Sequence, residues 1–264
     1  MHHVLTIAGS DSGGGAGIQA DLKTFAAHGV YGMSAITAVT AQNTERVTHV
    51  HVLPAAMVAA QIDAVASDIR IDAVKTGMLA DAAIVEIVAA ALVRWRLPHL
   101  VVDPVMVAKS GDHLLEPAAA AAVRKVLLPL ATIVTPNRSE AEVLAGRTVA
   151  TIADAREAAR RMTDAGCRAV VIKGGHFEGP RLVNLLFDGR DFTEIVTERV
   201  HTRNTHGTGC TFAAALAAQL ATGRTLTTAV QDATEYVAGA IAHAAPVGRG
   251  HGPVNHFWRR ETGG

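Results

Sequence analysis

Residues 204–210 contain the residue types of an anion-binding turn. The segment is Asn-Thr-His-Gly-Thr-Gly-Cys, and an alanine-rich helical pattern over 211–221 follows it directly. Gly207 and Gly209 allow successive backbone N–H groups to converge on one point. The first turn of the helix adds unpaired N–H groups and the positive end of the helix dipole. We therefore expect residues 207–210 to bind an anion, in particular a phosphate.

Cys210 lies inside this turn, where the field that holds an anion also favours a thiolate over a thiol. A thiolate beside a bound phosphate is a base in the position that phosphoryl transfer to an alcohol requires. The competing interpretation is a simple helix cap with a small buried thiol. A glycine-rich turn alone does not decide between these two interpretations.

A second glycine-rich segment, residues 9–17, follows the first predicted strand. Its glycines lack the G-x-G-x-x-G spacing, no Lys-Ser or Lys-Thr pair follows, and the next strand ends without an acidic residue for a ribose. An NAD-dependent oxidoreductase and a P-loop enzyme are therefore disfavoured. The loop could instead bring the backbone close to a flat ligand, with Asp21 one helical turn further on. From its position alone, Asp21 is expected to be a solvated helix residue.

Polar side chains follow the carboxyl ends of most predicted strands. They are Ser10, Asp11, Gln42, Asn43, Lys75, Asp103, Asn137, Glu140 and Lys173, with Met78 close behind Lys75. Ligands of open α/β sheets bind at this edge. An amide such as that of Gln42 can both donate to and accept from a heterocycle, although it can also close a turn. We expect the ligand site at this edge of the sheet.

Short β-branched runs alternate with helical patterns along the chain, and this alternation predicts how the polar residues are positioned. Strands are expected over 4–8, 31–40, 46–53, 73–75, 99–102, 131–134 and 169–172. Helices are expected up to residue 27 and over 54–69, 81–94, 118–127, 139–144, 152–165, 211–221 and 225–244. Because parallel strands need helical crossovers, the pattern predicts an α/β fold with a mostly parallel sheet and helices on both faces.

Two further segments complete the expected fold. Residues 183–187 and 192–200 alternate in polarity around a turn at 188–191, which predicts a β-hairpin near the edge of the sheet. The glycine-rich segment 248–253 is expected to be a flexible terminal loop. We expect residues 1–264 to form a single domain.

The composition excludes several classes of protein. The 264 residues include 24 Lys plus Arg and 24 Asp plus Glu, so no charge excess favours nucleic acid or an anionic membrane as a partner. No segment has the length of a membrane span. Cys167 and Cys210 lack metal-ligand spacing and are too few for a disulfide framework. These features predict a cytoplasmic protein with a small ligand.

Several segments carry a resemblance to a known family. They are residues 6–21, 40–44, 75–79, 101–106, 108–111, 135–137 with 140–141, 173–176 and 204–210. Taken together and in this order, they resemble the bacterial hydroxymethylpyrimidine/phosphomethylpyrimidine kinases of thiamine biosynthesis, which belong to the ribokinase-like superfamily. The resemblance implies a ribokinase-like fold with a small hairpin or flap. It also implies that ATP and Mg²⁺ are used to phosphorylate 4-amino-5-hydroxymethyl-2-methylpyrimidine to its monophosphate and then to its diphosphate.

The same resemblance implies roles for individual residues. The residues implied to hold the pyrimidine ring are Gly9, Asp21, Gln42 and Met78. The residues implied to form the anion hole are Gly207, Thr208, Gly209 and Cys210, and Cys210 would be the base that takes the hydroxymethyl proton. The residues implied to bind the nucleotide are Asp103, Asn137, Glu140, Lys173 and His206. Asp103 and Glu140 would act next to Mg²⁺, and Lys109 would belong to a mobile flap.

Alternative functions stay open beside this interpretation. Pyridoxal and pyridoxine kinases share the superfamily, and Gln42 and Met78 favour the pyrimidine without excluding those substrates. A non-catalytic ligand-binding protein would be expected to have lost Asp103, Glu140 or Cys210, and all three are present. The family also implies a homodimer.

Overall fold

The computed structural model describes residues 1–106, 117–174 and 181–261. Across these residues, nine strands form one sheet in the order β3-β2-β1-β4-β5-β6-β7-β8-β9. The strands are β1 (His3–Asp11), β2 (Tyr31–Gln42), β3 (Val47–Val52), β4 (Ala73–Thr76), β5 (Leu100–Val102), β6 (Ile133–Val134), β7 (Val170–Ile172), β8 (Arg181–Phe187) and β9 (Phe192–Glu198). Neighbouring strands from β2 to β7 are parallel, whereas β2–β3, β7–β8 and β8–β9 are antiparallel. The mostly parallel sheet predicted from the sequence is confirmed.

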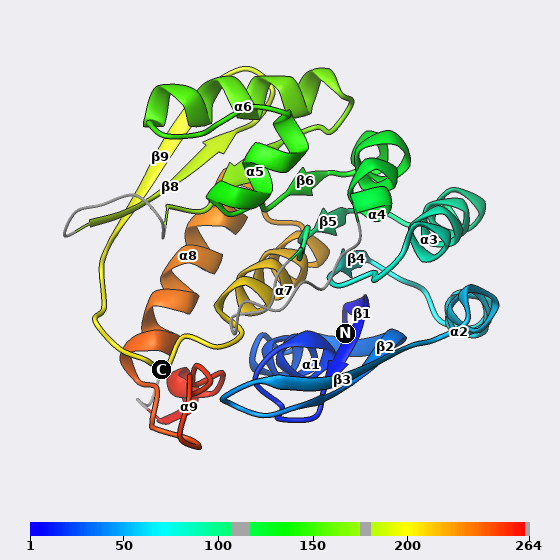
Figure 1. Cartoon of the computed structure of the whole chain (residues 1–264), viewed down its shortest axis with the longest axis horizontal. Helices are drawn as coiled ribbons and strands as arrows, with labels where there is room; N and C mark the ends of the chain where they lie inside the picture. The colour runs from blue at the N-terminus through cyan, green and yellow to red at the C-terminus, as the bar shows by residue number, and fades with distance from the viewer. Residues whose placement is uncertain (107–116, 175–180, 262–264) are drawn as a thin grey trace.

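Helices cover both faces of the sheet, as the alternating pattern predicts (Figure 1). One face carries α1 (Gly17–Ala27), α7 (Thr208–Ala221) and α8 (Leu226–Ala242). The other carries α2 (Ala55–Ala66), α3 (Ala82–Arg94), α4 (Pro117–Ala122), α5 (Arg138–Ala145) and α6 (Ile152–Asp164). Each face has its own cluster of buried apolar side chains, so the sheet separates two hydrophobic layers.

The central strands β4 to β7 are short and buried along their whole length. Strands covered on both faces are expected to be nearly continuous apolar runs, and these four mostly are. Lys75 in β4 is an exception, because it is a charged residue and its side chain is nevertheless fully buried. The parallel strands all end at one edge, so the polar residues that follow them are brought together there.

The predicted helix over 118–127 is interrupted in the structure. α4 is followed by a π-helix over Val123–Leu127 and a 3₁₀-helix over Leu128–Leu130. Pro129 lies in the 3₁₀-helix, and proline has no backbone N–H to continue α-helical hydrogen bonding. The α-helical pattern therefore ends before Pro129, and the chain then enters β6.

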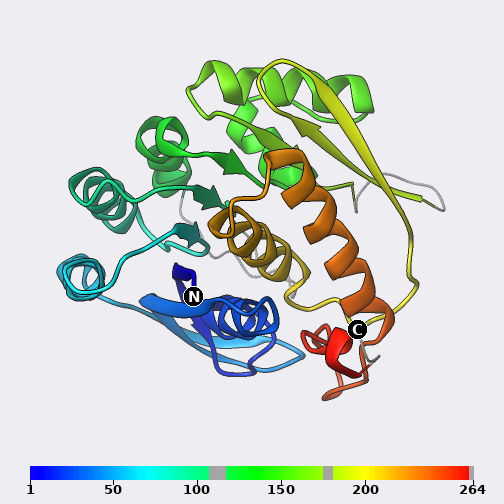
Figure 2. The ribbon, with the colours of Figure 1, turned by 180° about the vertical axis from the view of Figure 1, so that it is seen from behind.

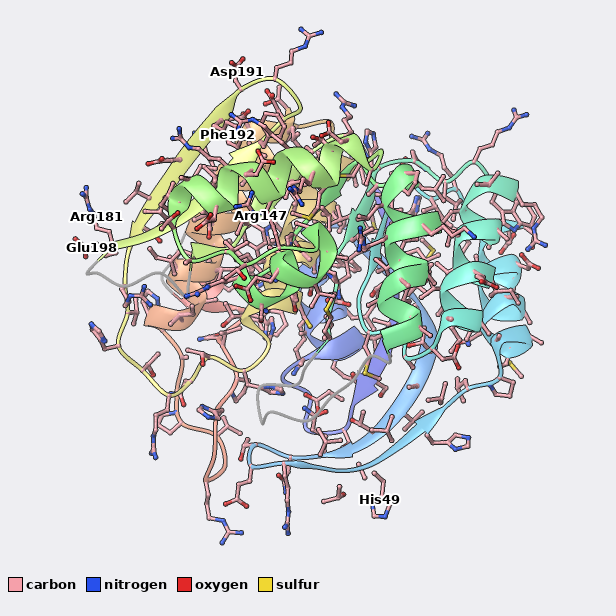
Figure 3. The ribbon with its side chains drawn as sticks, turned by 45° about the horizontal axis from the view of Figure 1, so that its top comes forward. His49, Arg147, Arg181, Asp191, Phe192 and Glu198 are labelled. Carbon is pink, nitrogen blue, oxygen red and sulfur yellow. The ribbon has the colours of Figure 1, made fainter. Side chains whose placement is uncertain are left out.

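β8 and β9 form the predicted hairpin at the edge of the sheet. Arg181 and Glu198 are paired at one end of the hairpin, and Asp191 lies at the opposite, turn end (Figure 3). In that turn the Asp188 carboxylate accepts hydrogen bonds of 2.8 Å from the backbone N–H groups of Arg190 and Asp191. Lys109, expected in a flap, lies outside the described residues.

Residues 248–256, which we call the C-terminal strap, are held against the rest of the chain. The N–H groups of Gly250 and His251 donate to the side-chain and main-chain oxygens of Thr44, respectively. Pro253 forms a bridge with His206. The expectation of a flexible terminal loop is therefore wrong, because backbone hydrogen bonds that a sequence pattern does not reveal fix this segment.

The chain between β9 and α7 runs alongside α8 toward the C-terminal strap, which is seen most clearly from behind (Figure 2). This path brings residues 204–210 to the carboxyl edge of the sheet. Within the described residues, no helix combines the length and the apolar composition that crossing a bilayer requires.

Candidate active site

A cleft of about 920 Å³ opens at the carboxyl edge of the parallel strands. It brings together most of the residues that the sequence singled out. Those that line it are Gly9, Gln42, Met78, Asp103, Asn137, Glu140, Lys173, His206, Gly207, Thr208, Gly209 and Cys210. Asp21 does not line the cleft. A single continuous space therefore reaches from the 9–17 loop to the group around Asp103.

The 204–210 turn opens α7 with Gly207 as the N-cap residue. Gly207 has a φ of 80°, and a Cβ at this position would lie 1.8 Å from the carbonyl oxygen of Gly15. Only glycine satisfies both conditions. A Cβ on Gly209 would lie 3.3 Å from Lys173 Nζ. The turn is therefore packed between the 9–17 loop and Lys173, and the first residues of α7, Thr208, Gly209 and Cys210, line the cleft.

Cys210 lies near the N-termini of two helices, because Gly17 at the start of α1 contributes a backbone hydrogen bond to the thiol. Even so, burial raises the pKa of the Cys210 thiol to about 11. The charge of Lys75 lowers this pKa, whereas the charges of Asp103 and Asp21 raise it. The expectation of a favoured thiolate is therefore wrong for the ligand-free protein. Burial has a larger effect on this pKa than the charge of Lys75 and the Gly17 hydrogen bond, which both lower it.

A buried ion pair lies beneath the cleft. Lys75 Nζ and Asp21 Oδ2 are 2.8 Å apart, and both side chains are fully buried. Thr6 Oγ1 donates to the same carboxylate oxygen at 2.6 Å. Asp21 is thus not the solvated helix residue that its position suggested. Lys75 was expected at the ligand-binding edge without a specific role, although a lysine inside a buried apolar strand was an available signal of a buried partner.

Opposite the 204–210 turn, Lys173 joins two carboxylates. Its Nζ is 3.0 Å from Asp103 Oδ1 and 3.8 Å from Glu140 Oε2. Asn137 and Glu140 form a capping box at the start of α5, in which Glu140 Oε2 accepts from the N–H of Asn137 at 2.7 Å. Burial raises the pKa of Glu140 to about 7, and the charge of Lys173 acts in the opposite direction.

This group is suited to a hard cation. Asp103 Oδ2 is buried and has no hydrogen-bond partner among the described residues, so it can serve as a ligand oxygen. The described ranges contain no cluster of three or more His, Cys, Asp or Glu side chains that could hold a metal on its own. Mg²⁺ commonly binds through one or two carboxylates together with waters and substrate phosphates. Asp103 and Glu140 therefore fit Mg²⁺ that arrives with a nucleotide.

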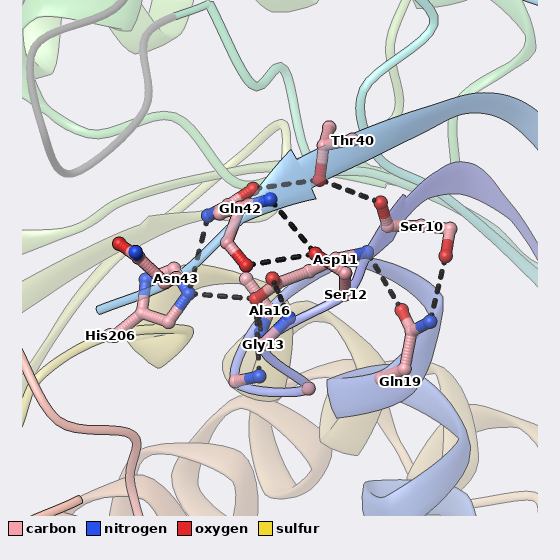
Figure 4. Close-up of polar contacts among 12 residues, drawn as sticks. Ser10, Asp11, Ser12, Gly13, Ala16, Gln19, Thr40, Gln42, Asn43 and His206 are labelled. Carbon is pink, nitrogen blue, oxygen red and sulfur yellow. Dashed lines mark hydrogen bonds and ion pairs between the residues drawn. The ribbon is translucent and has the colours of Figure 1, made fainter. Parts of the chain in front are cut away.

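Asp11 organises the 9–17 loop and contacts the 204–210 turn (Figure 4). Its carboxylate accepts hydrogen bonds from the N–H groups of Gly13, Gly15 and Ala16. His206 Nε2 is 2.8 Å from Asp11 Oδ2. The side chain of His206, expected to bind the nucleotide, therefore points to Asp11. Asp11 was expected at the ligand-binding edge without a specific role, although its place between a strand end and a glycine loop was a usable signal.

Gln42 and Met78 line the cleft next to the 9–17 loop. A Cβ on Gly9 would lie 2.7 Å from Met78 Cε, so the backbone is tightly packed against this side chain. Gln42 Oε1 accepts from Thr40 Oγ1 at 3.1 Å. Gln42 Nε2 is 3.5 Å from His206 Nε2, at the outer limit of hydrogen bonding. Because the proton on His206 Nε2 serves the Asp11 carboxylate, the two nitrogens are both donors, and the Gln42 amide remains available to a ligand acceptor.

The fold and the arrangement at its carboxyl edge define a protein of the ribokinase-like α/β class. A structure of Bacillus subtilis pyridoxal kinase with ADP is similar, with a TM-score of 0.92 and 41% identity over 98% of this chain and 99% of that chain. A model of the phosphomethylpyrimidine kinase family matches residues 11–255. The chain belongs to this family.

Relatives within the family cover nearly the whole chain. The hydroxymethylpyrimidine/phosphomethylpyrimidine kinase of Bacillus subtilis is 49% identical over 97% of this chain and 95% of its own length. A thiamine biosynthesis bifunctional protein of Geobacter sulfurreducens is 52% identical over 98% of this chain, which spans 53% of that protein. A structure of phosphomethylpyrimidine kinase from Clostridium difficile has a TM-score of 0.81, with 42% identity over 91% of this chain and 100% of that chain.

Proposed function

We propose that this chain phosphorylates 4-amino-5-hydroxymethyl-2-methylpyrimidine with ATP, first on the hydroxymethyl group and then on the resulting phosphate. One observation carries the proposal. The 204–210 turn, the Cys210 thiol and the group of Asp103, Glu140 and Lys173 all line a single cleft. The names of the relatives at about half identity, which are hydroxymethylpyrimidine/phosphomethylpyrimidine kinases, support the same reaction and substrate.

The chain's own residues supply binding, orientation and a proton acceptor. Phosphoryl transfer depends mainly on correct positioning and on stabilising the charge of the transferred group. The N–H groups at the start of α7 stabilise that charge, and Lys173 contributes a cation beside them. In its thiolate form, Cys210 accepts the proton of the hydroxymethyl group. The second acceptor is a phosphate monoester, already ionised at pH 7, and needs no base.

The two ends of the cleft suit the two substrates. The apolar side chains at the end near α8 suit a nucleotide base, and they are Leu182, Phe212, Val237, Ala238 and Ile241. The opposite end, with Gly9, Gln42 and Met78, suits a flat heteroaromatic ring. ATP use is supported by similar structures that hold AMP-PCP or ADP. When bound, Mg²⁺ at Asp103 and Glu140 would neutralise charge on the nucleotide phosphates.

Asp103→Asn is expected to raise the Mg²⁺ concentration needed for half-maximal rate by roughly 10- to 100-fold, because one of the two ligand carboxylates loses its charge. The measurement is the initial rate against free Mg²⁺ at saturating ATP. Asp68→Asn changes an exposed carboxylate and is the matched control. An unchanged Mg²⁺ requirement in Asp103→Asn would remove this residue from the metal site.

Gln42→Leu is expected to raise the KM for the pyrimidine by roughly 5- to 100-fold, because a ring acceptor in the closed cleft would lose its donor. The KM for ATP should stay the same. Gln231→Leu, an exposed amide on α8, is the control. Steady-state kinetics with each substrate varied in turn measures both constants. A pyrimidine KM that does not change would contradict the role of Gln42.

Purified protein with Mg-ATP and hydroxymethylpyrimidine, followed by mass spectrometry, tests the proposal directly. The expected result is monophosphate first and diphosphate later. Pyridoxal in a parallel reaction tests the alternative, which rests on the similar pyridoxal kinase structures. Phosphorylation of pyridoxal without either pyrimidine product would overturn the proposed substrate.

The proposal places the enzyme in the cytoplasm, where ATP is available, and Cys167 and Cys210 are both free thiols, as a reducing compartment favours. We also propose that it acts as a homodimer. The exposed apolar side chains Val50 and Val52, which lie on the same face of β3, support this, because they offer a surface to a second copy.

A further inference from the structure

The two glycine-rich segments of the cleft are joined by one buried contact. Asp11 and His206 are 195 residues apart in the chain, yet Asp11 Oδ2 and His206 Nε2 are 2.8 Å apart. Asp11 is 3% exposed and His206 is 9% exposed, so water does not replace this contact easily. A carboxylate at this distance fixes the proton on Nε2, and His206 donates to Asp11.

Asp11 is itself held firmly by the 9–17 loop. Its Oδ1 accepts from Gly13 N–H at 2.8 Å, and its Oδ2 accepts from Gly15 and Ala16 N–H at 3.1 and 2.8 Å. Burial raises the pKa of Asp11. The hydrogen bonds from His206 and Ala16 lower this pKa by more, so the pKa lies below its ordinary value. The carboxylate is therefore charged at neutral pH and strengthens each hydrogen bond that it accepts.

His206 is held equally firmly from the other direction. Its N–H donates to Gly252 at 3.0 Å, and its carbonyl oxygen accepts from the N–H of Val254 at 3.3 Å. Gly207 follows immediately and begins the anion-binding turn. A Cβ on Gly15 would lie 2.4 Å from His206 Cδ2, so the imidazole is also packed tightly against the 9–17 loop.

We infer that Asp11 and His206 are a positioning pair for phosphoryl transfer, a role that rests on the proposed kinase function. The 9–17 loop forms one wall of the ring pocket through Gly9, and the 204–210 turn carries the anion-binding N–H groups and Cys210. The Asp11–His206 hydrogen bond fixes the distance between these two parts. In this role His206 acts through the turn that it orients, and direct contact with the ring or the phosphates is not required.

A positioning role of His206 and a direct nucleotide contact by His206 predict different changes in kcat and in the KM for ATP. A nucleotide contact would mainly raise the KM for ATP, and a change at Asp11 would not reproduce the effect. A positioning pair acts on the reaction step, since misplacement by about 1 Å can cost 10²-fold in rate. We therefore expect His206→Ala and Asp11→Asn each to lower kcat by roughly 10- to 100-fold, with the KM for ATP changed by less than about 3-fold.

The test is a double-mutant cycle with rescue. Wild type, Asp11→Asn, His206→Ala, His206→Gln and the double variant Asp11→Asn/His206→Ala are compared by steady-state kinetics, with rates normalised to the folded fraction from circular dichroism. The double variant should be no slower than the slower single variant, because the pair acts as a unit. His206→Gln keeps a side-chain donor and should recover part of kcat.

Control variants and the contradicting outcomes are equally specific. Asp188→Asn alters a carboxylate that also accepts turn N–H groups, and His49→Ala alters an exposed imidazole on β3; neither should change kcat. Losses that multiply in the double variant, a rise confined to the KM for ATP, or losses explained by the unfolded fraction would each overturn the pair. Failure of the wild type to phosphorylate the pyrimidine would refute the proposed function instead.

Discussion

Cys210→Ala should lower the rate of the first phosphorylation by roughly 100- to 10,000-fold, the usual contribution of a general base. The second phosphorylation should fall far less, because its acceptor oxygen is already ionised. The measurement is single-turnover formation of each product, with the monophosphate supplied separately for the second step. Cys167→Ala alters a thiol that is 3% exposed and lies outside the cleft, and both of its rates should stay normal. Equal losses at the two steps in Cys210→Ala would argue against a base.

The pKa of about 11 for Cys210 adds a pH signature to this variant. Below that pKa the residue is a thiol, and the thiolate fraction rises about tenfold for each pH unit. The kcat/KM of the first step should therefore rise from pH 6 to pH 9. Cys210→Asp places a carboxylate whose ordinary pKa, about 3.9, lies well below that of a thiol, so its profile should level off at a lower pH than that of the wild type. The same slope in the two proteins would show that another group controls the rate.

Lys75→Met should destabilise the protein by about 3–5 kcal/mol, because it leaves the Asp21 carboxylate buried without its partner. Burial lowers the pKa of Lys75, but the charges of Asp21 and other nearby acidic groups keep this pKa above its ordinary value, so Lys75 is charged at neutral pH. Burial raises the pKa of Asp21, and the charge of Lys75 acts in the opposite direction. At about 2–4 °C per kcal/mol, this loss corresponds to a fall in Tm of roughly 6–20 °C. Differential scanning calorimetry measures the change.

A second variant separates the loss of a charge partner from the loss of packing. Asp21→Asn combined with Lys75→Met removes both charges, and Asn can still accept from Thr6, so the double variant should regain at least half of the lost stability. Lys125→Met changes an exposed lysine and should stay within about 0.5 kcal/mol of wild type. A double variant as unstable as Lys75→Met would show that packing, not the buried charge, controls stability here.

The parts of the site that the sequence predicted are those encoded by neighbouring residues. Apolar runs followed by Gln42, Asp103 or Lys173 locate strand ends, and parallel topology then brings those ends to one edge. The glycines and helical pattern around Cys210 likewise indicate an N-terminal turn without any distant information. The hairpin around Asp188 was recognisable for the same reason, since its turn and both strands are contiguous.

Features that depend on distant contacts were missed. Asp21 is an ordinary residue in its own segment, and its ion pair with Lys75 forms only when α1 packs on the sheet. The pKa of Cys210 depends on how deeply α7 is buried and on charges from other elements, which the local turn does not encode. The C-terminal strap has glycine-rich composition, yet Thr44 and His206 fix it by backbone hydrogen bonds.

His206 and its partners are synthesised at different times, and this determines when their contacts can form. Asp11 emerges from the ribosome early, whereas His206 follows 195 residues later and its backbone partners Gly252 and Val254 later still. Contacts of such long range form after the local ones, because closing the intervening chain costs entropy. During translation the sheet can assemble strand by strand around β1, but the catalytic geometry waits for the strap. The nascent chain is therefore expected to acquire its fold before it acquires activity.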